Sequence, residues 1–516
     1  MPKKTTSTGE RLLFDLIHSL TKSEKRSFKL YVKRGSEAST VKFVQLFDVM
    51  EKLPDYDEDA ILKKLPGVSK TQFSNLKAHL YSQLLSSLRQ GALNHDIDIQ
   101  LREQLDYIRL LYKKGLYAQS LRLLNRAKNV TGQYRKDLFQ LSLLDYEKQI
   151  RSQQVFDLEE RLVDEMDQDT LDAMERFGNV QHFFTLAIKL KARFIEKGMV
   201  KNETEMNNLK ALFQTKMRPF HDKEDELAFN EKFYYYRACY WYAYLTYDFH
   251  SCIHYAEKWV KLFEFTELDS KRRAGFLKGL NRLLQSAFRV DDREVFQQYY
   301  QRLIHFEEQE GPTLASNTQL LLAKYKAMQS LNLVFLNASF AENRETVEAA
   351  LEEVLKNEAF MDKHTLLILY YKAGIFYFAL NDYEKALSYL NRLIDDPENL
   401  RSDLKGFGRI VRLIIYYERA DEDKMERRIK TTYAFLKRQE SLGEFQHTIL
   451  DFLDNLGNIF PQDIKKGFSS LKEKLEALKA DKYKSKALLY FDIISWLDAK
   501  IEGISFGEAV KRKVSE

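Results

Sequence analysis

LLILYYKAGIFYFALNDYEKALSYLNRLIDDP, residues Leu366–Pro397, predicts two antiparallel helices joined by a short turn. Asn381 and Asp382 supply the turn, because short polar side chains hydrogen-bond to nearby backbone groups and tolerate turn geometry. Gly374 and Ala386 are small residues on the two helices, so the helices can cross closely. The stretch is therefore predicted to be a stacking module, and the rest of the chain is interpreted as variations on it.

The spacing within this stretch follows the pattern W-x2-L-G-x2-Y, then A-x3-F, then Pro, over about 34 residues. Three of the seven positions match in residue type and place, namely Gly374, Tyr377 and Ala386. The others carry similar or smaller residues, or come one residue early: Tyr370, Ala373, Leu390 and Pro397. The stretch thus resembles the tetratricopeptide repeat. This resemblance implies a right-handed solenoid of helix pairs with a concave, partner-binding groove.

The second-best match is YIRLLYKKGLYAQSLRLLNRAKNV, Tyr107–Val130, with Gly115 at its turn. Further helix pairs are expected along the chain. Their turns are spaced more widely than the family pattern, which indicates longer helices. The expected turns lie near Asp248, Asp292, Ala341, Asn381 and Asp421.

Composition favours the same fold class. At 516 residues the chain is several times the usual domain size, and only 19 Gly and 7 Pro leave too few turn residues for a β architecture. We therefore expect an all-α fold, an α-solenoid of antiparallel helix pairs with an N-terminal helical module. The expected divisions are a basic module at 1–90, a degenerate repeat array at 91–502 and a C-terminal tail at 503–516.

Charge and cysteine content indicate a cytoplasmic protein. Charged residues make up 30% of the chain and hydrophobic residues 44%, as in soluble proteins with large cores. Cys239 and Cys252 are too few for a disulfide framework. The N-terminus lacks a signal-peptide core, and no apolar run reaches the roughly 18 residues of a membrane span.

The basic excess lies entirely in residues 1–90, which hold 16 Lys and Arg against 10 Asp and Glu. Thr21 and Glu24 have capping-box spacing and predict a helix that ends near Arg34. Its five cations fall on one face: Lys22, Lys25, Arg26, Lys29 and Lys33. Such a face is either simply solvated or contacts an anionic partner such as nucleic acid.

Residues 57–90 also have two interpretations. A short helix, a turn at Pro66 and Gly67, and a helix capped by Ser69 and Gln72 resemble a helix-turn-helix. The exposed residues of the second helix would then contact DNA. Alternatively, the long apolar stripe of this helix, from Phe73 onward, docks it onto the rest of the protein.

No motif predicts enzyme chemistry. GISFG, Gly503–Gly507, matches the nucleophile-elbow pattern, but no Asp or His follows Ser505. His250 and His254 are one helical turn apart and lack a third metal ligand. We therefore predict a non-enzymatic protein with no catalytic residue, metal site or cofactor.

A second apolar stripe on the Leu366 helix indicates a partner-binding face. In the tetratricopeptide family this face lines the groove, which here would contain Ile368, Tyr371, Ile375 and Phe378. Between Phe229 and Phe265, 15 of 37 residues are aromatic. The same register there selects Tyr234, Arg237, Trp241 and Tyr244. Alternatively, a helix that is apolar on all sides is buried, and both faces are core.

The function predicted from these features is an interaction scaffold that holds a protein or peptide in its groove. An alternative from a different class is a nucleic-acid-binding regulator, in which residues 1–90 contact DNA or RNA and the repeats sense a partner.

Overall fold

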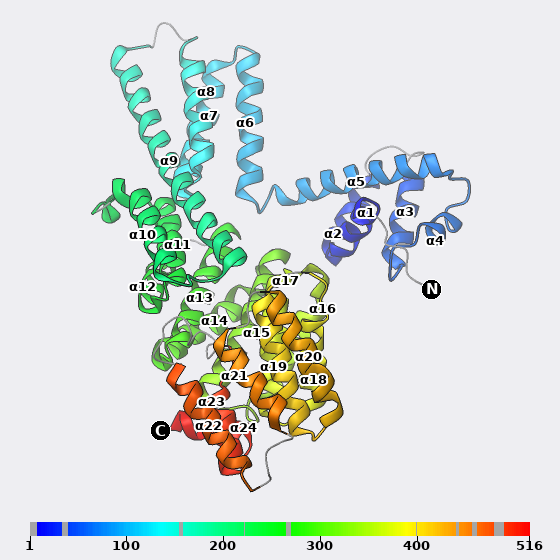
Figure 1. Ribbon diagram of the computed structural model, residues 1–516. Coiled ribbons are helices and arrows are strands. Elements are labelled where there is room, and N and C mark those ends of the chain that lie inside the picture. The colour runs from blue at the N-terminus through cyan, green and yellow to red at the C-terminus, as the bar shows by residue number, and fades with distance from the viewer. Residues whose placement is uncertain are drawn as a thin grey trace. The chain divides into compact units, whose positions relative to one another are not determined.

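The computed structural model describes residues 8–33, 40–153, 158–220, 222–264, 270–398, 400–439, 443–456, 462–478 and 490–515. Over these residues the chain forms twenty-four α-helices and no strand (Figure 1). The predicted all-α fold is thus confirmed. None of the described helices combines the length and the apolar character that a membrane span requires. The chain divides into two compact units, Met1–Met174 and Glu175–Glu516.

The first five helices share one apolar core, which lies within residues 13–88. Phe28, Phe47 and Phe73 come from three of these helices and are fully buried. The predicted capping boxes at Thr21 and Ser69 are both formed. The helices are α1 (Thr8–Ser19), α2 (Lys22–Lys33), α3 (Thr40–Lys52), α4 (Glu58–Lys63) and α5 (Lys70–Ala92).

Helices α4 and α5 have the order of a helix-turn-helix, with Gly67 in the left-handed region at φ 79°. The apolar stripe of α5 buries Phe73, Leu80 and Leu84 in the module core. Lys77 forms an ion pair with Glu58 at 3.2 Å. The apolar stripe of α5 therefore packs inside the module. This agrees with the second interpretation of residues 57–90, in which the stripe docks the helix onto the rest of the protein.

A second apolar cluster of the first unit lies among α6 (Ile97–Lys113), α7 (Tyr117–Gln133) and α8 (Asp137–Arg151). The buried hydroxyl of Ser120 donates a hydrogen bond of 2.9 Å to the carbonyl of Ile108, so this small residue lets α6 and α7 cross closely. The first unit therefore extends past the predicted boundary at residue 90 and ends within α9 (Glu160–Lys197).

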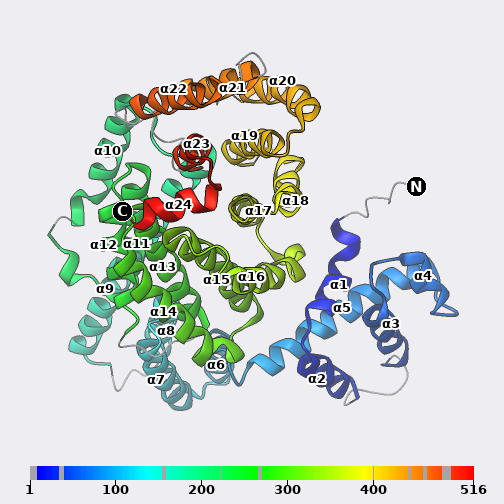
Figure 2. The ribbon, with the colours of Figure 1, turned by 90° about the horizontal axis from the view of Figure 1, so that it is seen from below.

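The second unit is a solenoid of antiparallel helix pairs, seen end-on in Figure 2. The first helix of one pair packs on the first helix of the next, from α13 through α15 and α17 to α19. The helices after α9 are α10 (Glu203–Met217), α11 (Phe229–Leu245), α12 (Phe249–Lys261), α13 (Ser270–Arg289), α14 (Arg293–Glu310), α15 (Ser316–Asn337), α16 (Arg344–Lys356), α17 (Lys363–Ala379), α18 (Tyr383–Ile394), α19 (Ser402–Glu418), α20 (Glu422–Arg438), α21 (Glu444–Asn455) and α22 (Ile464–Ala477). Short 3-10 helices occur at Arg218–Phe220, Glu224–Glu226, Gly311–Thr313 and Glu358–Phe360.

Four of these pairs share one turn geometry. A residue with positive φ is followed by an Asp, whose backbone N–H bonds at 2.9 Å to the carbonyl five residues earlier. The carboxylate of the same Asp then caps the second helix of the pair. The turn predicted at Asn381 and Asp382 is one of the four. The Asp residues are Asp248, Asp292, Asp382 and Asp421.

The C-terminal residues fold back onto the solenoid as α23 (Ile493–Glu502) and α24 (Phe506–Ser515). Both lie on the inner side of the arc formed by α15, α17 and α19 (Figure 2). A Cβ at Gly507 would stand 2.6 Å from the carbonyl oxygen of Ala379, so α24 approaches the backbone of α17 closely. The tail predicted at 503–516 is thus a packed helix, because Phe506, Ala509 and Val510 form one buried apolar face.

Candidate functional site

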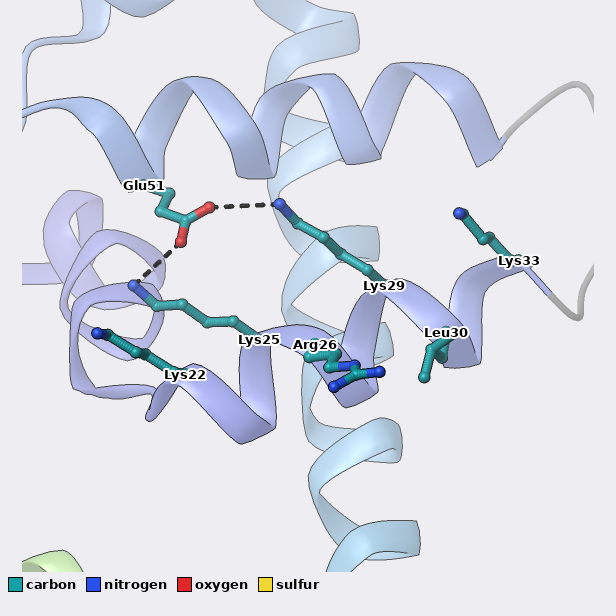
Figure 3. A pocket seen from close by; sticks show the side chains of 7 residues that line it. All are labelled: Lys22, Lys25, Arg26, Lys29, Leu30, Lys33 and Glu51. Atoms are coloured by element: carbon teal, nitrogen blue, oxygen red, sulfur yellow. Dashed lines mark ion pairs between the residues drawn. The ribbon is translucent and has the colours of Figure 1, made fainter.

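The five cations predicted on α2 line an open depression of about 370 Å³ together with Leu30 and Glu51 (Figure 3). Two of them are paired with α3. Lys25 lies 3.3 Å from Glu51, and Lys29 lies 2.8 Å from Asp48, whose hydrogen bond raises the pKa of Lys29. Among the described residues, the other three have no ion-pair partner, so the depression presents free positive charge: Lys22, Arg26 and Lys33.

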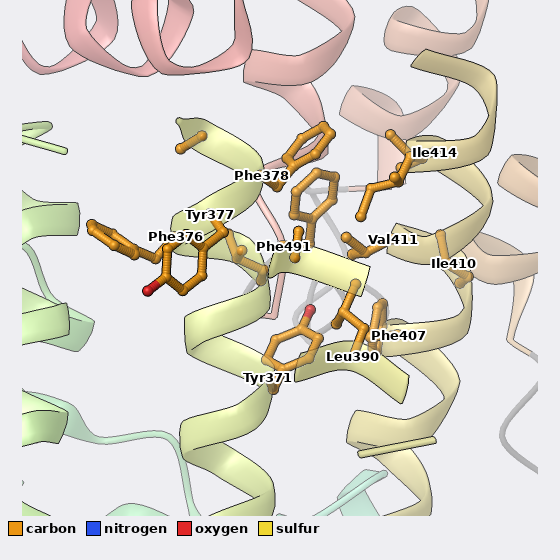
Figure 4. Close-up of a cluster of buried hydrophobic side chains, with 14 of the residues drawn as sticks. Tyr371, Phe376, Tyr377, Phe378, Leu390, Phe407, Ile410, Val411, Ile414 and Phe491 are labelled. Atoms are coloured by element: carbon orange, nitrogen blue, oxygen red, sulfur yellow. The ribbon is translucent and has the colours of Figure 1, made fainter. Parts of the chain in front are cut away.

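The groove predicted on α17 is filled by the C-terminal segment of the chain itself (Figure 4). The ring of Phe378 lies 6.0 Å from that of Phe491 and 5.1 Å from that of Phe506. The hydroxyl of Tyr371 donates a hydrogen bond of 3.1 Å to the carbonyl of Tyr490. The four predicted residues therefore do not form an open groove. Tyr371, Ile375 and Phe378 are buried, and Ile368 is half-buried.

On α11 the four predicted residues divide into two groups. Trp241 and Tyr244 are buried in the core of the unit, whereas Tyr234 and Arg237 are half-buried. The guanidinium of Arg237 lies 5.1 to 5.6 Å from the centroids of four aromatic rings. Its Nε has no hydrogen-bond partner among the described residues, and burial lowers its pKa. The rings belong to Phe184, Phe233, Tyr234 and Trp259.

Helix α13 places a polar stripe beside this Arg. Lys278, Arg282, Gln285 and Arg289 follow one another at intervals of four, three and four residues, so they share one helix face. The guanidinium of Arg282 stacks 4.7 Å above the ring of Trp241 on α11 and donates a hydrogen bond of 2.8 Å to Gln285. We call the side of the first helices that carries this stripe and Arg237 the inner face.

Two lysines complete the cationic character of the inner face. Lys191 on α9 and Lys278 on α13 are exposed, yet burial by the surrounding helices lowers the pKa of both. Repulsion from Arg282 and Arg237 lowers the pKa of Lys191 further.

Asp362, a carboxylate that attracts Lys191, is already paired. Asp362 accepts a hydrogen bond of 2.6 Å from Lys324. Burial alone would raise the pKa of Asp362, but this contact with Lys324 lowers it to about 2. The inner cation cluster comprises four cations of α9, α11 and α13, none of which has an ion-pair partner among the described residues: Lys191, Arg237, Lys278 and Arg282.

Ser505, from the GISFG segment that matches the nucleophile-elbow pattern, has a structural role. Ser505 caps α24, because its hydroxyl accepts a hydrogen bond from the backbone N–H of Glu508 and donates one of 2.7 Å to the Glu508 carboxylate. Among the described residues, no group of three or more His, Cys, Asp or Glu side chains could hold a metal ion. Cys239 and Cys252 are free and buried, and burial raises the pKa of both thiols.

No protein-family model, curated protein or solved structure matches the chain, so the α2 depression and the inner cation cluster are the basis for a functional proposal.

Proposed function

We propose that the protein is a non-enzymatic, cytoplasmic helical-repeat scaffold that holds a protein or peptide segment against the inner face of its second unit. The observation that carries this proposal is the accessible mixture of cations and aromatic rings on three consecutive first helices. Tyr234 and Arg237 on α11, Arg282 on α13 and Tyr325 on α15 are all half-buried. Tyr and Arg are the residues that most often supply binding energy at protein interfaces.

The packing of the C-terminal segment supports a partner site in the first half of the unit. Helix α24 contacts α15 and α17, and Trp496 of α23 donates a hydrogen bond of 2.7 Å to Glu418 on α19. The C-terminal segment of the same chain therefore covers the apolar stripe of α17. The cations of α9, α11 and α13 instead remain open to an external ligand.

Site-specific photo-crosslinking tests this proposal. A photoreactive residue at Gln285, on the inner face, should crosslink a protein partner in cells that produce the full chain. The same residue at His305, which is 64% exposed on α14, is the matched control and should capture much less. Crosslinks that survive nuclease support the scaffold. Equal capture at both positions, or loss after nuclease treatment, contradicts it.

Nucleic-acid binding by α2 is a second candidate function, which the α2 depression favours. Phosphate groups would contact its unpaired cations directly, whereas Lys25 and Lys29 are neutralised by α3. Three phosphate contacts supply little affinity at physiological salt, because each contributes a slope of only about −0.9 to log affinity against log salt.

We therefore expect that a mobility-shift assay detects no complex of the full chain with duplex DNA at about 150 mM salt. Replacing Lys22, Arg26 and Lys33 by Gln should flatten the salt slope by at most about 2 to 3 units. Gln keeps the helix folded, since its helix propensity is close to that of Lys. A complex that persists at this salt concentration and is abolished by the three substitutions would instead favour the nucleic-acid regulator.

A further inference from the structure

The inner cation cluster has no ion-pair partner among the residues that the structure describes, so its positive charge is not compensated within them. Lys191, Arg237, Lys278 and Arg282 come from three helices, and the nearby Asp362 is already neutralised by Lys324 at 2.6 Å. Lys278 and Arg282 are one turn apart on α13, and Arg282 lies 4.7 Å from the ring of Trp241 on α11. Arg237 is one turn before Trp241 on the same helix. Burial lowers the pKa of Lys191 and Lys278, and repulsion from Arg237 lowers both further, as expected for cations that lie near one another. Like charges held together destabilise the folded protein, and such unfavourable arrangements occur preferentially at binding sites.

The cluster also offers many hydrogen-bond donors. Among the described residues, Nε of Arg237 has no hydrogen-bond acceptor, and Arg282 donates one hydrogen bond, to Gln285. Each guanidinium has five N–H groups and each ammonium has three. A phosphate ester offers three acceptor oxygens and a charge of about −1.5 to −2 at neutral pH, whereas a carboxylate carries a single charge. A phosphate group therefore matches this compact set of four cations better than one carboxylate does.

The aromatic rings near the cluster contact its arginines, so these ring faces are not free to stack on a ligand. Arg237 lies over the rings of Phe184, Phe233, Tyr234 and Trp259, and Arg282 lies over Trp241. Proteins that bind single-stranded nucleic acid stack bases on unoccupied ring faces. Since cation–π contacts occupy these faces, the cluster is suited to recognise an anionic group and not a base.

We propose that the inner cation cluster is a binding site for a phosphate group, supplied by a phosphorylated segment of a partner protein. The inference rests on the proposed function, because it assigns the chemistry of the segment held on the inner face. Recognition of phosphorylated segments by clustered Arg side chains is a general mode of peptide binding.

A purified full chain should bind a fluorescent Gly-Ser peptide that carries two phosphoserines. The same peptide with Glu at both positions should bind about tenfold more weakly, and the unphosphorylated peptide more weakly still. Inorganic pyrophosphate and a single-stranded oligonucleotide are the competing probes. If either binds more tightly than the phosphopeptide, a phosphorylated protein segment is not the ligand and the proposal is overturned.

A matched pair of variants locates the binding site. Replacing Lys191, Lys278 and Arg282 by Gln should weaken phosphopeptide binding by about tenfold or more. Folding should survive, because the substitutions relieve repulsion and leave the ring-packed Arg237 in place. The control variant removes the same charge from outer helices, at lysines that are 56%, 69% and 84% exposed, and should bind normally: Lys261→Gln, Lys356→Gln and Lys466→Gln. Equal loss in both variants would overturn the proposal.

Phosphatase treatment separates this inference from the proposed function. The partner that crosslinks at Gln285 should be lost when the lysate is dephosphorylated before photolysis. If the partner is captured equally after dephosphorylation, the scaffold proposal stands and the phosphate site is wrong. If no partner is captured but the phosphopeptide binds through the cluster, the phosphate site stands and the scaffold proposal fails.

Discussion

Gly374→Leu should lower the free energy of unfolding of the second unit by about 3 kcal/mol, because overpacking a close helix crossing forces the backbones apart. A Cβ at Gly374 would lie 2.7 Å from Cγ of Leu390 and 3.5 Å from the carbonyl oxygen of Ala386. Two atoms of the Leu390 side chain stand within 2.8 Å of this position, and Leu390 itself is fully buried. The crossing of α17 and α18 therefore has no room for a larger side chain. Urea unfolding followed by circular dichroism measures the change.

A second helical glycine in the same unit supplies the control for this substitution. Gly178 lies in α9, and a Cβ built there meets nothing within 4 Å. Gly178→Leu should be neutral, or should stabilise the helix by up to about 1 kcal/mol through its better helix propensity. If both substitutions have the same small effect, α17 and α18 do not cross as closely as Gly374 and Ala386 imply.

The features that could be predicted from the sequence are local ones. The turn at Asn381 and Asp382 depends on a few adjacent residues, and so do the capping boxes at Thr21 and Ser69. The periodicity of each helix is likewise contained in one window of sequence. These local signals were enough to predict the α-solenoid. Membership of the tetratricopeptide family stays a prediction.

The sequence left open whether this face of α17 is a groove or core, because the contacts that cover it join residues more than 100 positions apart. An apolar stripe such as Tyr371 and Phe378 has the same sequence pattern whether a partner or the chain itself covers it. The segment that covers it begins at Tyr490 and was predicted in part as a tail. Its amphipathic pattern at Phe506, Ala509 and Val510 was the available signal.

The inner cation cluster was missed for a different reason. Summed over the residues after position 90, the charges are close to neutral. A local excess on one helix face disappears in such a sum. The spacing of Lys278, Arg282 and Arg289 carries the same helical signal as the basic face of α2. Only the fold, however, brings Lys191 and Arg237 to that face from two other helices.

Phe378→Ala should lower the free energy of unfolding by about 3 to 5 kcal/mol, the usual effect of truncating a buried aromatic side chain. The residue exposes only 1% of its surface and lies between α17 and the C-terminal segment. Phe506→Ala should have a similar effect, since Phe506 packs against the same ring from α24. Phe360→Ala is the matched control, because Phe360 is 55% exposed and its truncation should change stability by no more than about 0.5 kcal/mol.

The double variant, with Phe378 and Phe506 both replaced by Ala, tests whether α24 is held by this contact. The two ring centroids are 5.1 Å apart. Because aromatic pairs contribute beyond their buried area, the double variant should be more stable than the sum of the single effects predicts, by about 0.5 to 1.5 kcal/mol. Strictly additive effects would mean that the rings do not touch in solution, and that the inner side of α17 is then open to a partner after all.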